Sequence, residues 1–197
     1  MADITPGMIK ELRDKTGLGL KKCKEALVEA AGDIEKAVEA LRKSGLAAAE
    51  KRMGRSASEG AVFSYIHGNG KLGVLLELNC ETDFVAKTDD FQGLGKDICM
   101  HIAAMAPRWV DQNDVDAAYI EKEKEIAREQ IKNKPENVIE KIIDGKIKKI
   151  LADNCLLMQG FVKDDKQTID ALIKSFIAKL GENIKVGKFS RIQLGAE

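Results

Sequence analysis

An alternating apolar run at residues 71–80, KLGVLLELNC, constrains the fold more than any other stretch of this chain. Its apolar side chains fall at every second position, so an extended strand presents them on one face. They are Leu72, Val74, Leu76, Leu78 and Cys80. A second run, AVFSYIH at 61–67, precedes it, and the glycine-rich HGNGK between the two is typical of a tight turn. The sequence therefore predicts an antiparallel hairpin.

Helical patterns account for most of the remaining core. We expect helices over 88–105, over 115–132, from Lys134-Pro135 onward, and over 168–180. The third of these carries a broad apolar stripe that needs a packing partner: Val138, Ile139, Ile142, Ile143, Ile147, Ile150 and Leu151. The last run, GENIKVGKFSRIQL at 181–194, returns to a strand that can join the hairpin. The pattern predicts an α+β fold, a helix-rich core with a small antiparallel sheet of about three strands.

Residues 1–45 show three short helical patterns that glycines separate. Each has one apolar stripe, and the three stripes must bury one another, so we expect a compact three-helix module with its third helix ending at Ser44-Gly45. Residues 46–58, LAAAEKRMGRSAS, are alanine-rich and basic and predict a connecting helix. Residues 59–197 then form the core domain.

The composition excludes a disordered chain, because 44% of the residues are hydrophobic and 32% are charged. The formal net charge is zero, which argues against a general nucleic-acid coat; we expect no direct nucleic-acid partner. Four cysteines lie far apart without a CxxC pair and are typical of reduced, buried thiols. No apolar run approaches the roughly 18 residues of a membrane span, so we expect a cytoplasmic protein without a membrane partner.

No motif forms a catalytic centre, so we expect a protein that is not an enzyme and holds no metal or cofactor. GNGKLG at 68–73 matches GxGxxG, but a strand and not a helix follows it, which favours a hairpin turn over a dinucleotide site. His67 and His101 lack a set of ligands at metal-binding spacing. Paired carboxylates fall on charged helix faces such as EKEKE, where solvated ion pairs explain them.

The segment TDFV, Thr82–Val85, is harder to explain structurally. It places an aromatic and an aliphatic side chain at the end of the predicted strand, where loops carry function and exposed apolar groups mark contact surfaces. The alternative is that Phe84 folds back onto the following helix. The basic stretch from Arg42 to Arg55 is equally open, because it suits either an acidic partner or a solvated helix.

Five ordered stretches resemble the elongation factor Ts family, the guanine-nucleotide exchange factors of elongation factor Tu. They are IKELRDKTGLGLKKCKEAL, GDIEKAVEALRKSG, LELNCETDFVAK, KPENVIEKIIDGKIKK and LGENIKV. The resemblance covers nearly the whole chain, whose length suits a compact bacterial form of the family. It implies a ubiquitin-associated-like module over residues 1–45 and a dimerisation core, and it implies a homodimer.

In this family the TDFV segment lies beside the partner's nucleotide site, where it displaces the Mg²⁺ coordination and loosens the GDP phosphates. By motif match, Asp83 and Phe84 would intrude and Thr82 and Val85 would flank them. Burying one phenylalanine contributes about 1.5–3 kcal/mol, whereas exchange enhanced about 10⁴-fold needs about 5.5 kcal/mol. A second anchor is therefore expected, and its candidates lie on the TGLG turn and the basic stretches: Leu18, Leu20, Lys21, Lys22 and Lys51.

Two other hypotheses remain open at this stage. A polypeptide-binding adaptor would use the three-helix module alone, and Asp83 and Phe84 would then be freely replaceable. A nucleotide-dependent enzyme would use GNGKLG and would bind GDP or NAD by itself.

Overall fold

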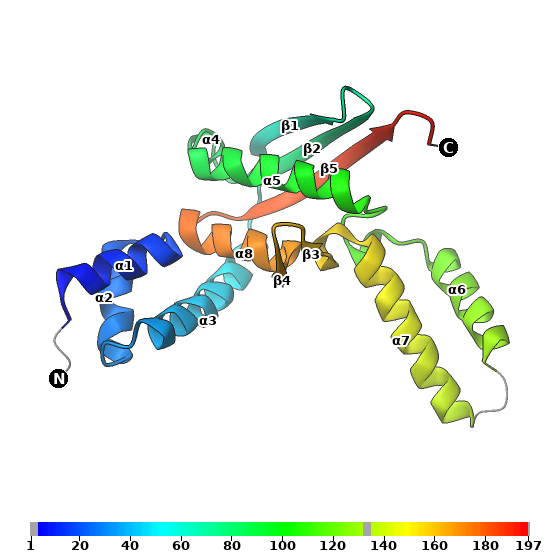
Figure 1. The fold of residues 1–197 in the computed structure, drawn as a ribbon, viewed down its shortest axis with the longest axis horizontal. Coiled ribbons are helices and arrows are strands. Elements are labelled where there is room, and N and C mark those ends of the chain that lie inside the picture. Colours follow the sequence, from blue (N-terminus) through cyan, green and yellow to red (C-terminus); the bar gives the residue numbers. More distant parts are fainter. Residues whose placement is uncertain (1–3, 132–134, 197) are drawn as a thin grey trace. The chain divides into compact units, whose positions relative to one another are not determined.

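A computed structural model describes residues 4–131 and 135–196 (Figure 1). Its elements in chain order are α1 (Pro6–Thr16), α2 (Leu20–Glu29), α3 (Ile34–Met53), β1 (Glu59–His67), β2 (Leu72–Cys80), α4 (Asp83–Ala86), α5 (Asp89–Met105), the 3₁₀ turn η1 (Gln112–Asp114), α6 (Ala117–Gln130), α7 (Glu136–Asn154), the 3₁₀ turn η2 (Leu156–Met158), β3 (Gly160–Phe161), β4 (Asp164–Thr168), α8 (Ile169–Leu180) and β5 (Ile184–Gln193). The predicted α+β class is confirmed.

The chain forms two compact units, each assembled from separated stretches. Unit 1 comprises Met1–Gly60, Asn79–Phe91 and Ile173–Lys185, and unit 2 comprises Ala61–Leu78, Gln92–Leu172 and Val186–Glu197. The TDFV segment and the first three helices thus belong to the same unit. The predicted domain boundaries at residues 45 and 58 divide the chain into consecutive segments, whereas each unit combines separated stretches. These boundaries stay a prediction.

Helices α1, α2 and α3 pack around a small apolar core in unit 1. Its buried members are Leu12, Cys23, Ala26, Leu27, Ala37 and Leu41. Thr5 caps α1 by accepting a hydrogen bond from the Met8 amide, and Pro6 opens the helix. Gly17 ends α1 in the left-handed conformation, with φ of 65°. The predicted three N-terminal helices are confirmed.

The third helix does not end at Ser44-Gly45, so that prediction was wrong. Helix α3 continues to Met53 and absorbs most of the predicted connecting helix. Gly45 has a packing role, because a Cβ atom built on it would lie 3.2 Å from Ala178 Cβ of α8. The glycine lets two helices approach closely and does not break one.

The predicted three-stranded sheet is confirmed, with strand order β1-β2-β5. The turn between β1 and β2 contains Gly68, Asn69 and Gly70, all with positive φ, so GNGKLG is a hairpin turn that leads into a strand. Helix α5 covers the sheet so closely that a Cβ atom on Gly95 would overlap the Phe63 ring. Arg191 of β5 donates to the Ala103 carbonyl of the same helix.

Helices α6 and α7 pack together within unit 2. Buried residues Ala127, Ile143 and Ile147 form their core. The apolar stripe predicted from Val138 to Leu151 thus has a partner inside the chain. The first of these helices was predicted to end at residue 132, and the second was predicted to begin at Lys134. Residues 132–134 lie outside the described residues.

The short antiparallel pair β3-β4 was not predicted. It lies near His101, whose Nδ1 accepts from the Val162 amide and whose Nε2 lies 3.0 Å from Gln159 Oε1. These bonds give the buried imidazole a hydrogen-bond partner at each ring nitrogen. All four cysteines are buried and free. Within residues 4–131 and 135–196, no helix is both long and apolar enough to cross a membrane.

Candidate functional site

The TDFV segment folds into one short helical turn directly after the central strand. Strand β2 ends at the buried Cys80, and Thr82 then caps α4 in an extended conformation. Its Oγ1 accepts from the Val85 amide at 3.4 Å. Ala86 is buried and anchors the turn from below. The chain thus follows an apolar strand with a capped turn whose side chains point in different directions.

Phe84 is 78% exposed, the most exposed of the large apolar residues in the described chain. The alternative that it folds back onto the following helix is therefore wrong. Asp83 is also exposed, Thr82 and Val85 are half-buried, and the segment presents a ring and a carboxylate together. An exposed aromatic side chain on a turn fixed by a cap is typical of a contact surface.

Asp83 has a neighbour that the sequence interpretation did not weigh. Lys87 Nζ lies 2.6 Å from Asp83 Oδ2, one turn further along the chain. The hydrogen bond from Lys87 and its positive charge hold the pKa of Asp83 below the ordinary value, and the same hydrogen bond and the negative charge of Asp83 raise the pKa of Lys87. The Asp83 carboxylate is thus ionised and oriented before any partner arrives.

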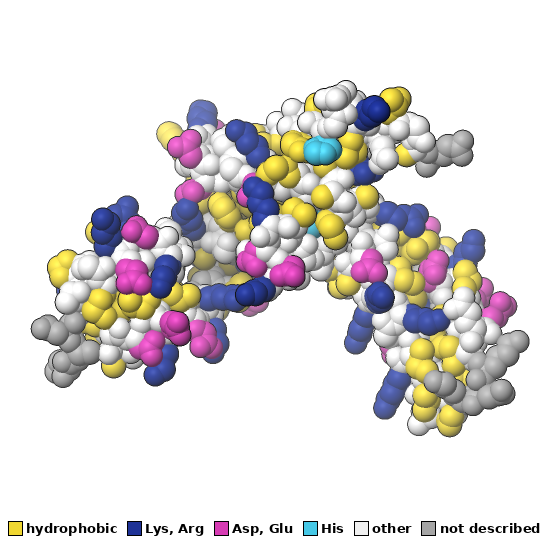
Figure 2. Space-filling model, viewed as in Figure 1, with side chains coloured by type: hydrophobic (Ala, Val, Ile, Leu, Met, Phe, Trp, Pro, Cys, Tyr) yellow, Lys and Arg dark blue, Asp and Glu magenta, His cyan; other side chains and the backbone are white. Residues whose placement is uncertain are grey.

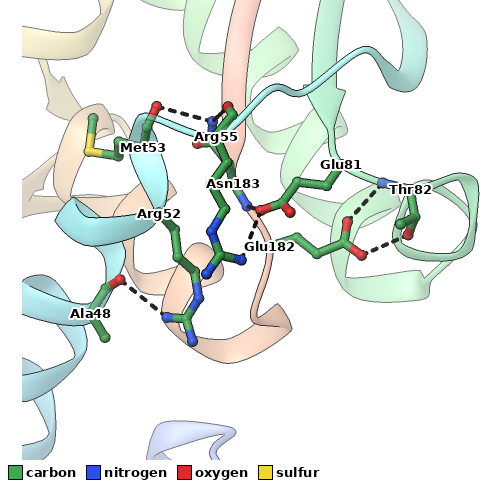
Figure 3. A network of polar contacts seen from close by, with 8 residues as sticks. All are labelled: Ala48, Arg52, Met53, Arg55, Glu81, Thr82, Glu182 and Asn183. Atoms are coloured by element: carbon green, nitrogen blue, oxygen red, sulfur yellow. Dashed lines mark hydrogen bonds and ion pairs between the residues drawn. The ribbon is translucent and has the colours of Figure 1, made fainter.

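Glu182 holds Thr82 with both of its carboxylate oxygens (Figure 3). The Thr82 amide donates to Oε2 at 3.0 Å, and the Thr82 hydroxyl donates to Oε1 at 2.7 Å. Hydrogen bonds to an ionised acceptor are stronger than neutral ones. The first residue of the TDFV segment is therefore fixed to the connection between α8 and β5.

The neighbouring residue, Asn183, connects the same region to the end of α3 (Figure 3). It is buried, and its side-chain amide donates to the Met53 carbonyl at 3.2 Å and to the Arg55 carbonyl at 2.7 Å. Its backbone amide donates to Glu81 Oε1 at 2.6 Å, and Arg55 lies 3.6 Å from the same oxygen. One polar network thus joins the end of α3, the TDFV segment and the α8–β5 connection.

The residues suggested for a second anchor lie in three places. Leu18 packs on the core of the three-helix module and, with Lys22, lines a groove of about 350 Å³ between α2, α3 and α8. Leu20 and Lys21 are exposed at the start of α2, and Lys51 is exposed in the last turn of α3, but none of these three lines the groove. On the face seen in Figure 2, basic and acidic side chains alternate over these helices, without a large area of one charge.

Sequence reasoning missed Glu182, Asn183 and Lys87. The stretch LGENIKV contains the first two and contributed to the resemblance, but no role was assigned to it. Lys87 lies four residues after Asp83, a spacing that pairs opposite charges on a helix. That spacing was the signal available for Lys87.

The part of the chain that the structure describes holds no group of three or more His, Cys, Asp or Glu side chains arranged to bind a metal ion. Cys80, at the base of the TDFV segment, donates to the Thr82 carbonyl at 3.1 Å. Burial raises the pKa of its thiol. The chemistry of this region is therefore that of an exposed acid and ring on a rigid support.

Comparison with known proteins identifies the family. The family model described as "Elongation factor TS" matches residues 14–196. Elongation factor Ts of Fervidobacterium nodosum is 60% identical over 98% of this chain and 99% of its own length. The factors of Thermosipho melanesiensis and Thermotoga neapolitana are 56% and 52% identical, with 98% and 99% of this chain and 99% of each relative covered. The chain belongs to the elongation factor Ts family.

Proposed function

We propose that this chain is a guanine-nucleotide exchange factor that binds elongation factor Tu carrying GDP and promotes GDP release during translation elongation. Membership of the family supports the role, and the exposed Phe84 beside the ionised Asp83 is the observation that carries it. Asp83 and Phe84 act on the Mg²⁺ and phosphate site of the partner, flanked by Thr82 and Val85. The factor holds no cofactor, performs no chemical catalysis and works in the cytoplasm.

The physical basis is a difference in affinity between two states of the partner. Phe84 loses most of its exposed surface when it enters a pocket, which contributes about 1.5–3 kcal/mol. A carboxylate near Mg²⁺ competes for the ion and repels the phosphates. Because the coupling is reciprocal, bound GDP lowers the partner's affinity for the factor by the same ratio as the bound factor lowers its affinity for GDP. The factor can therefore dissociate when nucleotide binds.

The test uses elongation factor Tu loaded with a fluorescent GDP and an excess of unlabelled nucleotide. Addition of this protein accelerates loss of the fluorescent nucleotide, and Phe84→Ala removes most of the acceleration while the melting temperature stays unchanged, because Phe84 is exposed. Val162→Ala, a change at another exposed apolar residue, is the matched control and keeps full activity.

No acceleration by the unmodified chain overturns the proposal. Full activity of Phe84→Ala instead removes the TDFV segment from the mechanism and favours the adaptor hypothesis. Equilibrium dialysis of the protein alone with GDP or NAD tests the remaining hypothesis, and we expect no binding.

We also propose that the chain forms a homodimer through the open face of the sheet. Alternation along the strands places Val62, Ile66, Leu75 and Ile192 opposite the face that α5 covers, and all four are more than half exposed. Exposed apolar residues gathered on one sheet face are typical of an interface. Sedimentation equilibrium tests this: Val62→Lys with Ile192→Lys yields a monomer, whereas an unchanged mass contradicts it.

A further inference from the structure

Residues 179–183, the last two of α8 and the three that join it to β5, contact three separate parts of unit 1. Glu182 binds Thr82, and Asn183 binds the carbonyls at the end of α3. Lys179 adds two contacts. Its Nζ lies 2.6 Å from Asp90 Oδ1, at the start of α5 just beyond the TDFV segment. Its side chain also lies against Gly17, at the end of α1.

The contact at Gly17 is close. A Cβ atom built on Gly17 would lie 2.8 Å from Lys179 Cε, and the positive φ of Gly17 independently favours glycine at that position. Gly17 belongs to the TGLG turn, which was suggested as part of the second anchor. Two residues of this short segment therefore contact the two suggested anchors: Glu182 contacts the TDFV segment, and Lys179 contacts the TGLG turn.

We propose that the 179–183 segment is a positioning element that sets the spacing between the TDFV segment and the TGLG turn, and that Glu182 is its principal residue. The inference rests on the proposed function, which places partner contacts at both ends. In the docked complex, a TDFV segment held at a fixed spacing from the TGLG turn keeps its productive orientation, whereas a loosely held one adopts that orientation only part of the time, which lowers the maximal rate.

Glu182 is the residue whose loss has the largest expected effect. Both of its oxygens accept from Thr82, so truncation leaves the Thr82 amide and hydroxyl without their acceptor. Thr82 also caps α4 through its Oγ1. Glu182 is half-buried, and both of its carboxylate oxygens are bonded to Thr82, so we expect its influence on exchange to pass through Thr82.

Three variants separate positioning from simple structural damage. Glu182→Ala removes both acceptors. Glu182→Gln keeps two hydrogen bonds, because its carbonyl oxygen accepts from the Thr82 amide and its NH₂ group donates to the Thr82 hydroxyl. Asp97→Ala is the matched control. Asp97 is also a carboxylate paired with a residue distant in the sequence, Lys163 at 2.7 Å, but it lies in unit 2.

Nucleotide exchange on elongation factor Tu is measured across partner concentrations, with rates normalised to the binding-competent fraction found by titration. Glu182→Ala removes both charge-assisted hydrogen bonds to Thr82 and is expected to lower the maximal rate at least about tenfold, with little change in the half-saturating concentration. Glu182→Gln and Asp97→Ala keep near-normal rates. If Glu182→Ala does not fold, Lys179→Met, which keeps the stem against Gly17 and loses the bond to Asp90, provides the test through a smaller loss of maximal rate.

Hydrogen exchange on the free protein gives a readout that does not need the partner. The Val85 and Ala86 amides are expected to exchange faster in Glu182→Ala and at the normal rate in Glu182→Gln. Normal amide protection together with a normal exchange rate in Glu182→Ala overturns the inference, as does a Glu182→Gln variant as inactive as Glu182→Ala. An inactive wild-type chain overturns the proposed function instead, and the amide comparison still tests the positioning of the TDFV segment.

Discussion

His101 Nε2 and Gln159 Oε1 lie 3.0 Å apart in the buried interior of unit 2, and 58 residues of sequence separate them. The Val162 amide donates to the other ring nitrogen, which must therefore carry no proton. Burial lowers the pKa of His101, and the bond to Gln159 opposes this only in part. The folded protein thus holds a neutral imidazole.

This arrangement predicts acid sensitivity. Below the ordinary histidine pKa of about 6.5 the unfolded chain binds a proton at His101 that the folded chain refuses, so the free energy of unfolding falls as the pH drops below about 6.5. Urea unfolding between pH 7 and pH 5 measures the slope. His101→Gln reduces it. An unchanged slope in His101→Gln contradicts the assignment.

Two glycines of α5 predict opposite effects of the same substitution. Gly95→Ala places a methyl group where it overlaps the Phe63 ring, and such overpacking costs about 1–3 kcal/mol. Gly93→Ala meets no atom within 4 Å and removes a glycine from a helix, so it stabilises by up to about 1 kcal/mol. Chemical denaturation of the two variants measures both changes. Equal effects at the two positions would show that α5 does not pack on β1 as described.

The buried thiols predict slow alkylation. Burial raises the pKa of Cys99 to about 11 and also raises the pKa of Cys80 and Cys155. At neutral pH these thiols are protonated and shielded, so iodoacetamide modifies the four cysteines slowly in the folded protein and quickly in urea. Mass spectrometry of the modified chain tests this. Rapid modification of Cys99 in the native state is the contrary result.

Cys99 also predicts a loss of stability in alkali. Its thiol ionises in the unfolded chain near pH 8.5 but stays protonated in the folded chain to about pH 11. Its contribution to the free energy of unfolding is therefore complete below about pH 8.5 and falls as the pH rises towards about 11. Cys99→Ala has a shallower alkaline slope than the unmodified protein in urea unfolding. Identical slopes would exclude this role.

The ion pair between Asp83 and Lys87 predicts a measurable shift at the proposed contact surface. Lys87→Met removes the hydrogen bond and the charge that lower the pKa of Asp83, so the carboxyl titrates at higher pH in the variant. Carbon NMR of the labelled carboxyl measures the difference, which shrinks as salt is added. The melting temperature changes little, because both side chains are exposed. An unshifted Asp83 resonance would show that the pair does not form in solution.

Local patterns predicted the parts of the fold that local forces determine. The alternation from Leu72 to Cys80 predicted β2 because burial of one face imposes a period of two residues. The end of α3 was predicted wrongly for the opposite reason. Gly45 is a breaker by local preference, and only its distant neighbour Ala178 explains why a helix keeps it.

The candidate site divides in the same way. The TDFV segment was found because its composition did not suit a turn, but the exposure of Phe84 depends on the direction in which α4 leaves the strand. Glu182 was not predicted because its contact with Thr82 joins residues 100 positions apart. The strand β4, DDKQT, has no apolar alternation that a pattern can detect.

The bond between Thr82 and Glu182 also bears on how the protein folds. Closing a loop of 100 residues has an entropic cost, and the free energy gained by forming strand β2 and the capped turn does not offset it. Contacts of such long range form late in folding when local structure comes first. During synthesis, the TDFV segment leaves the ribosome long before Glu182 is made. The proposed contact surface therefore takes its final geometry only after the other end of the chain has been synthesised. Until then, a partly folded chain exposes Phe84 without fixing the spacing between the TDFV segment and the TGLG turn.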